Sequence, residues 1–207
     1  MKRILIAMVL LRLAGAGASG AQQAAPAETL VWCGLDYSMV RMIGTADFHQ
    51  PQQIFPGMLT AWNGLFMNEM LPQLQSMAKS VQTDLKSVTA RNDKVSEKQI
   101  DREDGSRDEK VKPSHITDSD IAQAVRSYEL KADSGLGLVF IMDRLVKAQE
   151  TGCMYVVFFD IASRKVVRSE RVCASAGGIG FRNYWFRPVK TVVKQLPKMY
   201  KDARSKK

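Results

Sequence analysis

Two strand-like runs that meet at a short polar turn constrain the fold of this chain more than any other feature. The runs cover residues 153–159 and 165–173, and both contain the β-branched or aromatic residues that favour strands. Together with the polar turn they predict a β-hairpin. A three-residue hairpin loop would pair Cys153 with Cys173, whereas a slip by one residue would turn the two thiols to opposite faces of the sheet.

The remaining apolar segments predict further strands with helices between them. Residues 30–35 form a continuous apolar run, which is typical of a strand covered on both faces, and residues 138–146 predict another strand. Residues 38–44 either extend the first strand or form a short bridging turn. The order of elements favours an α+β or mixed α/β fold: a single layered sandwich in which helices pack on a mostly antiparallel sheet, with a C-terminal strand meander and a terminal helix.

Apolar residues that recur every three or four positions predict the helices. The first helix begins near Pro56, which suits a first turn, and Pro72 should kink or split it. A second helix is capped by Asp118. The apolar residues of the first helix, which we expect to pack on the sheet, are Leu59, Trp62, Leu65, Phe66, Met70, Leu74 and Met77.

Charge is distributed unevenly along the chain. Residues 86–112 carry 15 charged side chains and few apolar ones, which predicts an exposed segment. The formal net charge is +9, of which residues 1–21 contribute +3 and residues 187–207 contribute +7, so that the body carries −1. The basicity therefore belongs to the two ends of the chain, and a nucleic acid is not expected as the partner.

The N-terminus has the order of a secretory signal peptide. A positive start is followed by an apolar run and then by small residues up to Ala21. Arg12 interrupts the apolar run, which is too short for a transmembrane anchor. We therefore expect residues 1–21 to be removed on export, leaving residues 22–207 as a single globular domain in the periplasm or outside the cell, with residues 86–112 as its charged exposed segment.

Three cysteines in an exported chain allow one disulfide and one remaining thiol. A bridge between Cys153 and Cys173 and a pair of buried reduced thiols are both compatible with the hairpin. Cys33 lies in the apolar run 30–35, and we expect it to be a buried apolar residue.

A glycine cluster precedes the last predicted helix and is a candidate binding element. Exposed backbone N–H groups at a helix start can hold an anion, or the glycines simply allow the chain to turn. The aromatic and polar residues that follow are of types enriched at binding hot spots, or they form an apolar plug at the helix start. This candidate site comprises Gly177, Gly178, Gly180, Arg182, Asn183, Tyr184 and Trp185.

Residues for catalysis or metal binding are few. Cys33 with His49 is a conceivable pairing of a thiol and a base, although a mid-strand thiol is poorly placed to react. A pair of carboxylates is the other option for a hydrolase, drawn from Asp36, Asp47, Asp143 and Asp160, although Asp is also common where strands end. Two isolated histidines do not make a zinc pattern, so we expect neither a metal nor a cofactor.

The C-terminal segment reads as an amphipathic helix with a basic side. Val189, Val193 and Leu196 are expected to face the core. The opposite side, which we call the basic stripe, consists of Lys190, Lys194, Lys198 and Lys201. Lysines near a helix C-terminus are favoured by the helix dipole alone, and they are also suited to contact an anionic lipid or polymer.

The turn Phe159-Asp160-Ile161, followed by Arg164-Lys165-Val166-Val167 and Ser169, resembles the ending of several periplasmic α/β assembly factors. These are the TolB N-terminal domain, the curli secretion protein CsgG and the lipoprotein activators of peptidoglycan synthases. Those families carry a Gly in this turn where this chain has Arg164. The chain also looks like an uncharacterised exported family with a GGxGFRNYW element. The resemblance implies a noncatalytic role in the cell envelope and transfers no functional residue.

These observations predict a noncatalytic exported envelope protein with a binding or assembly role, whose partner is another envelope protein or an anionic surface. The alternative is an envelope hydrolase that uses Cys33 and His49 or a pair of carboxylates.

Overall fold

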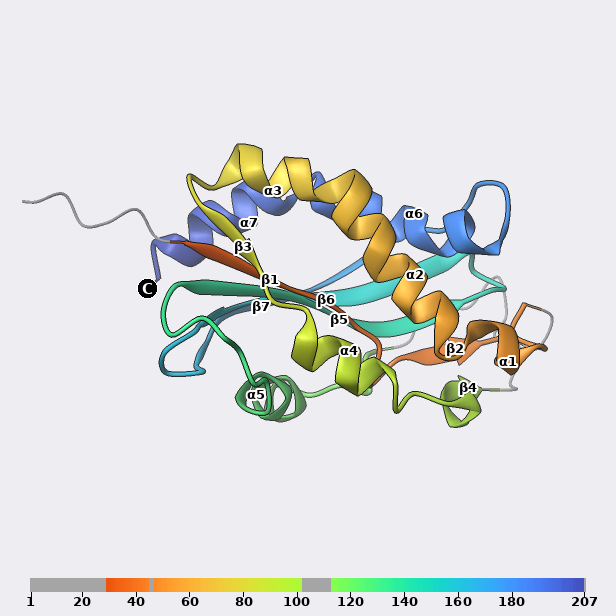
Figure 1. Ribbon diagram of the computed structural model, residues 1–207. Coiled ribbons are helices and arrows are strands. Elements are labelled where there is room, and N and C mark those ends of the chain that lie inside the picture. Colours follow the sequence, from red (N-terminus) through yellow and green to blue (C-terminus); the bar gives the residue numbers. More distant parts are fainter. Residues whose placement is uncertain (1–28, 45–46, 102–112, 207) are drawn as a thin grey trace, which may run out of the picture.

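The computed structural model describes residues 29–44, 47–101 and 113–206, and Figure 1 shows a sheet with helices on both faces. The strands are β1 (Leu30–Asp36), β2 (Arg41–Ile43), β3 (Val81–Thr83), β4 (Ile100–Asp101), β5 (Leu136–Val146), β6 (Thr151–Asp160) and β7 (Val166–Ser175). The helices are α1 (Pro51–Ile54), α2 (Gly57–Leu65), the π-helical turn η1 (Phe66–Met70), α3 (Leu71–Met77), α4 (Lys86–Asn92), the 3₁₀ turn η2 (Glu97–Gln99), α5 (Asp118–Arg126), α6 (Phe181–Val193) and α7 (Leu196–Arg204).

The expectation of a mostly antiparallel sheet is wrong. Strands β1 to β5 form a parallel arrangement, in which β1 pairs with β3 and β5, and β2 pairs with β4 and β5. Only the β5–β6–β7 meander is antiparallel, as the hairpin pattern predicted. The fold is therefore an α/β sandwich with a mainly parallel sheet. The parallel strands β2, β3 and β4 have three residues or fewer, which is too short for a recognisable sequence pattern.

Strands β1 and β2 lie end to end along one edge of β5. The whole length of β5 pairs with β6, from Leu136 opposite Asp160 to Val146 opposite Thr151. Because a strand has only two edges, β1 and β2 must share the other one, with β1 on the first half of β5 and β2 on the second. Residues 38–44 thus form a bridging turn, one of the two predicted alternatives, which leads into the separate strand β2.

Two buried asparagines satisfy the backbone where β1 leaves the sheet. The side chain of Asn63 on α2 accepts a hydrogen bond from Leu35 N (2.8 Å) and donates one to Leu35 O (3.1 Å). Asn92 on α4 accepts one from Tyr37 N (2.7 Å) and also donates to Leu35 O (2.8 Å). These side-chain bonds take the place of strand-to-strand hydrogen bonds where β1 ends, so the backbone groups of Leu35 and Tyr37 remain paired.

The sheet divides the core into two layers (Figure 1). Helices α2, α3, α6 and α7 cover one face, where Trp32 and Leu138 are buried. Helices α4 and α5 cover the other face, where Val31 and Val139 are buried. Alternate residues of β1 and β5 therefore enter opposite cores, which explains why both strands are apolar without alternation.

The helical predictions hold with changes at their ends. The predicted split at Pro72 is present, because the π-helical turn η1 separates α2 from α3 and Pro72 lies in the first turn of α3. Thr117, and not Asp118, is the N-cap of α5. The predicted terminal helix is two helices, α6 and α7, with Pro197 in the first turn of the second.

The charged segment 86–112 is folded in its first part. Residues 86–101 form α4, η2 and β4, and they bury Val88, Asn92 and Val95. The buried side chains lie on one side of this part, and its charged side chains remain largely at the surface. Residues 102–112 lie outside the described residues, as does the predicted signal peptide 1–21. Within the described ranges, no helix combines the length and apolarity needed to cross a membrane.

Candidate functional site

Three lysines near the C-terminus form a candidate positively charged surface. Lys194, Lys198 and Lys201 are exposed, and no carboxylate among residues 29–44, 47–101 and 113–206 forms an ion pair with them. The acidic residue of α7, Asp202, is bound instead by Arg168 of β7, at 3.5 Å. We call Lys194, Lys198 and Lys201 the lysine surface.

The fourth residue of the predicted basic stripe has a different role. Lys190 forms an ion pair with Glu69 of η1, and its ammonium group lies 5.6 Å from the centre of the Phe186 ring. It therefore joins α6 to the helix beside it. The apolar side of the same segment is buried as predicted, at Val189, Val193 and Leu196.

The glycine cluster turns the chain from β7 into α6. Gly177, Gly178 and Gly180 have φ values of 152°, 116° and 78°, which side chains with a Cβ atom rarely adopt. Gly177 N donates to Tyr184 O (3.1 Å), so this N–H is already used within the turn. Ile179 between the glycines is 93% exposed and is the single large apolar side chain found exposed in the described part of the chain. It was not among the predicted site residues, although an apolar residue flanked by glycines is a visible signal in the sequence.

The aromatic residues after the glycines pack inward. Trp185 is buried and stacks on Phe48, with ring centres 5.3 Å apart. The carbonyl of Arg182 accepts a hydrogen bond from Trp62 Nε1 (2.8 Å). The side chains of Arg182 and Asn183 are exposed, and Tyr184 is half-buried. The arrangement is a plug that attaches the start of α6 to α2, with only its polar members at the surface.

Cys33 and His49 are not brought together. Cys33 lies in the core beneath α4 and α5, whereas Phe48, next to His49, lies in the core on the opposite face of the sheet. Burial raises the pKa of the Cys33 thiol to about 12, and Asp84 adds to this rise. The thiol is therefore protonated at neutral pH, a state that does not suit a nucleophile.

Two of the four candidate carboxylates stand on adjacent strands, since Asp36 pairs with Ile141, two positions before Asp143. Asp36 is fully buried and accepts hydrogen bonds from Ser38 N (2.9 Å), Arg91 Nε (2.9 Å) and Tyr128 Oη (2.7 Å). Burial, followed by the charge of Asp36, raises the pKa of Tyr128 well above its usual value.

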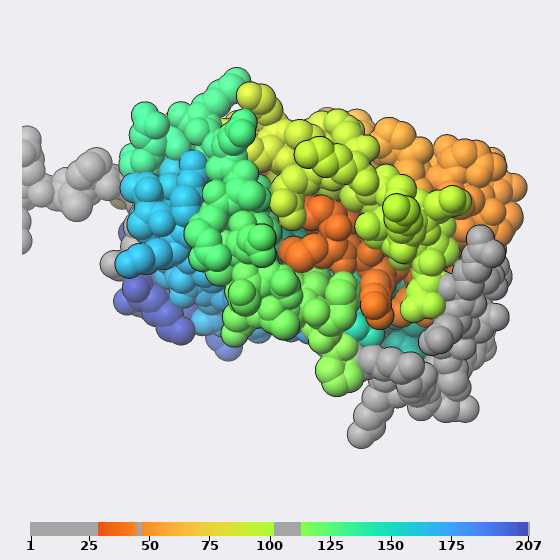
Figure 2. All heavy atoms as spheres, turned by 90° about the horizontal axis from the view of Figure 1, so that it is seen from below, coloured from red at the N-terminus to blue at the C-terminus, as the bar shows by residue number. Residues whose placement is uncertain are grey.

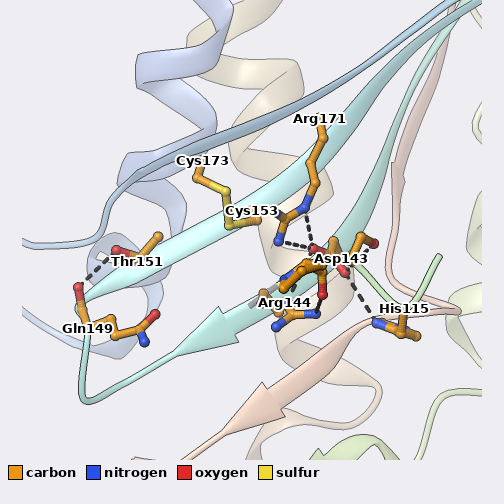
Figure 3. The surroundings of a disulfide bond; sticks show 10 residues. His115, Asp143, Arg144, Gln149, Thr151, Cys153, Arg171 and Cys173 are labelled. Atoms are coloured by element: carbon orange, nitrogen blue, oxygen red, sulfur yellow. Dashed lines mark hydrogen bonds and ion pairs between the residues drawn. A yellow bond between two sulfur atoms is a disulfide. The ribbon is translucent and has the colours of Figure 1, made fainter. Parts of the chain in front are cut away.

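Asp143 is the centre of a second buried network (Figure 3). Its Oδ2 accepts bonds from Arg171 (2.6 and 2.8 Å) and Arg144 (3.3 Å). Its Oδ1 accepts from Ser114 Oγ (2.9 Å) and lies 3.2 Å from Nδ1 of His115. Both oxygens are thus occupied in a side chain that has no exposed surface.

The second ring nitrogen of His115 also faces an acceptor. Nε2 lies 2.9 Å from the carbonyl oxygen of Met39, so this nitrogen donates its hydrogen and is not placed as a base. The other carboxylates have local roles, because Asp47 pairs with Lys147 (3.3 Å) and Asp160 accepts from Ser163 in the hairpin turn. Among the described residues, no group of three or more His, Cys, Asp or Glu is placed to hold a metal ion.

A disulfide joins β6 and β7 beside this network (Figure 3). Cys153 and Cys173 are directly opposed in the ladder, and their Cα atoms are 4.0 Å apart. This is the register that a three-residue loop predicts, although a bulge at Phe158 and Phe159 shifts the pairing next to the turn. Arg164 in that turn has a φ of 57°, the left-handed conformation that favours glycine.

A shallow hollow lies over the break between β1 and β2. Figure 2 shows the orange residues of this region between α4 and the segment that contains α5. The hollow measures about 360 Å³, and its lining includes Arg41, Lys98, His115 and Asp120. Asp120 is held by the backbone and hydroxyl of Thr117 (2.8 and 2.7 Å), which lowers its pKa. The hollow is polar, and its acidic member is used to cap α5.

Comparisons with known proteins add no relative. No protein family, no curated protein and no solved structure matches this chain. Its function therefore has to be inferred from its own fold, charges and surfaces.

Proposed function

We propose that this chain is a noncatalytic exported envelope protein that binds an anionic membrane surface through the lysine surface. The observation that carries the proposal is the set of three exposed lysines that no neighbouring carboxylate among the described residues neutralises. Unpaired cations close together on a surface attract anionic lipid headgroups, with about 1 kcal/mol for each basic residue near the surface.

Several further observations favour a binding role in the envelope. The Cys153–Cys173 bridge suits an oxidising compartment. The buried carboxylates of Asp36 and Asp143 are fully engaged in hydrogen bonds, and His115 faces two acceptors, so these groups serve the structure. The resemblance of the hairpin to periplasmic assembly factors points to the same location.

Sedimentation with lipid vesicles tests the proposal. The oxidised protein is mixed with vesicles that contain either anionic or only zwitterionic lipid, at low and at high salt. We expect binding to the anionic vesicles alone, and binding should fall steeply with salt because exposed charges are screened. Changing Lys194, Lys198 and Lys201 to Gln removes roughly 3 kcal/mol of electrostatic attraction in total, so the affinity for anionic vesicles should fall by about a hundredfold.

A matched variant separates the lysine surface from net charge. Changing Lys79, Lys86 and Lys131 to Gln removes the same charge from exposed positions outside α6 and α7. This control should bind within about threefold of the unmodified protein. Equal binding by both triple variants, or no preference for anionic vesicles, would contradict the proposal.

A further inference from the structure

The two outer edges of the sheet differ in length. One edge consists of β3 and β4, with three and two residues. The other is β7, with ten residues, and in the described part of the chain β7 pairs only with β6. Short edge strands give little opportunity for pairing with another chain, whereas a long one offers a row of backbone donors and acceptors.

The disulfide shows which residues of β7 face outward. A Cα separation of 4.0 Å between Cys153 and Cys173 identifies a pair without backbone hydrogen bonds to each other. Beyond the strand, Ala176 N donates to Glu150 O at 2.6 Å, three positions from Cys173. Even-numbered residues of β7 therefore direct their backbone N–H and C=O groups toward β6. Ser169 and Cys173 are odd-numbered and direct theirs to the free edge.

Charges along β7 favour one antiparallel register with a second copy of the same strand. Around a two-fold axis, only residues on the same face of the sheet can stand opposite each other. An axis at Ser169 places Arg168 opposite Glu170 of the second copy, and this pair occurs twice. An axis at Glu170 or at Arg171 would instead place like charges directly opposite each other, which is destabilising.

Two polar side-chain atoms next to the proposed axis have no partner within the described part of their own chain. Ser169 Oγ and Arg168 Nε are buried side-chain atoms without a hydrogen-bond partner in the described residues. With the axis at Ser169, the partly exposed side chain of Arg168 lies on the same face of the sheet as Glu170 of the other copy. Arg168 already contacts Glu170 and Asp202 of its own chain, so it lies among acceptors on the correct face.

We propose that two copies of this chain associate through their β7 edges, with antiparallel pairing centred on Ser169. The two sheets become continuous, Ser169 exchanges backbone hydrogen bonds with its equivalent, and Arg168 of each copy pairs with Glu170 of the other. The proposal does not depend on membrane binding, because it uses the edge of the sheet and not the lysine surface.

Analytical ultracentrifugation of the oxidised protein over a wide concentration range tests this association. We expect a concentration-dependent dimer. Ser169→Pro removes an outward N–H and leaves the bonds to β6 in place, so the dimer dissociation constant should rise by about tenfold or more. Ser169→Ala keeps the N–H and is the matched control, and it should still form dimers.

A charge exchange gives a second, independent test. Glu170→Arg places two positive charges opposite each other and should weaken the dimer, whereas the double variant Arg168→Glu with Glu170→Arg should restore it. Circular dichroism and mass mapping of the Cys153–Cys173 bridge establish that each variant is folded. A monomer at all concentrations, or a dimer that neither Ser169→Pro nor Glu170→Arg weakens, would overturn the proposal.

Discussion

Removing the charge of Asp143 should be among the most destabilising single changes in this protein. Asp143 has no exposed surface, and it accepts bonds from Arg171 and Arg144 on one oxygen and from Ser114 on the other. Asp143→Asn keeps the shape of the side chain but leaves the guanidinium groups without their counter-charge. The Arg144 side chain is only 5% exposed, so it cannot reach water without disturbing the core.

The expected loss of folding stability follows from the burial of the ion pairs of Asp143. Breaking a buried ion pair by removing one partner typically destabilises a protein by about 3–5 kcal/mol. The matched control is Asp202→Asn, because Asp202 pairs with Arg168 at the surface and its side chain is 39% exposed. Exposed pairs contribute about 0–1 kcal/mol, so the control should change the free energy of unfolding very little.

Urea unfolding with the disulfide intact measures both variants. The free energy of unfolding in water is obtained by linear extrapolation, provided that the slopes agree. The double variant Asp143→Asn with Arg144→Met should be more stable than Asp143→Asn alone, because it removes the buried charge that was left unpaired. A cost for Asp143→Asn below about 1 kcal/mol, or equal to that of Asp202→Asn, would refute the reasoning.

Three further predictions concern the cysteines and the hairpin turn. Replacing Cys153 and Cys173 by Ala should lower the free energy of unfolding by about 3 kcal/mol, because the bridge closes a loop between residues with a sequence separation of 20. Urea titration of the variant and of the oxidised protein measures this loss, and a much smaller loss would contradict the prediction. Cys33 has a pKa of about 12 in the folded protein against 9.0 for the free thiol, so the unfolded state loses its proton first and stability falls as pH rises from about 9 to 12. Cys33→Ala should reduce this loss of stability at alkaline pH, and an unchanged pH profile of the unfolding midpoint would argue against the prediction. Arg164→Gly should raise the free energy of unfolding by about 0.5–1 kcal/mol, since glycine adopts a positive φ without strain, and a lower melting temperature would contradict this.

The hairpin could be predicted from the sequence because its information is local. The runs on either side of the turn predict the hairpin, and the three-residue loop, one of the registers considered, places Cys153 opposite Cys173 as observed. The parallel part of the sheet could not be predicted in this way. Strand β4 has only two residues, and β2 is defined by its pairing with β4 and β5, which are distant in the sequence.

The candidate site was predictable to a similar extent. The helical spacing of Lys194, Lys198 and Lys201 predicted their exposure, since it depends on one amphipathic segment. The ion pair of Lys190 with Glu69 joins elements that are far apart along the chain, so no spacing rule could reveal it. The donors around Asp143 likewise come from separate segments of the chain, including Ser114 and Arg171.

The covalent bond between β6 and β7 also determines how far the C-terminal part can detach. Helices α6 and α7 follow β7 directly, and they cover one face of the sheet. If these helices separate locally, the separation can propagate backward along the chain only until it reaches Cys173, which is bonded to the neighbouring strand. In native-state hydrogen exchange, amides of α6 and α7 would then open as one unit at lower free energy, while those of β6 and β7 would open only with the whole domain.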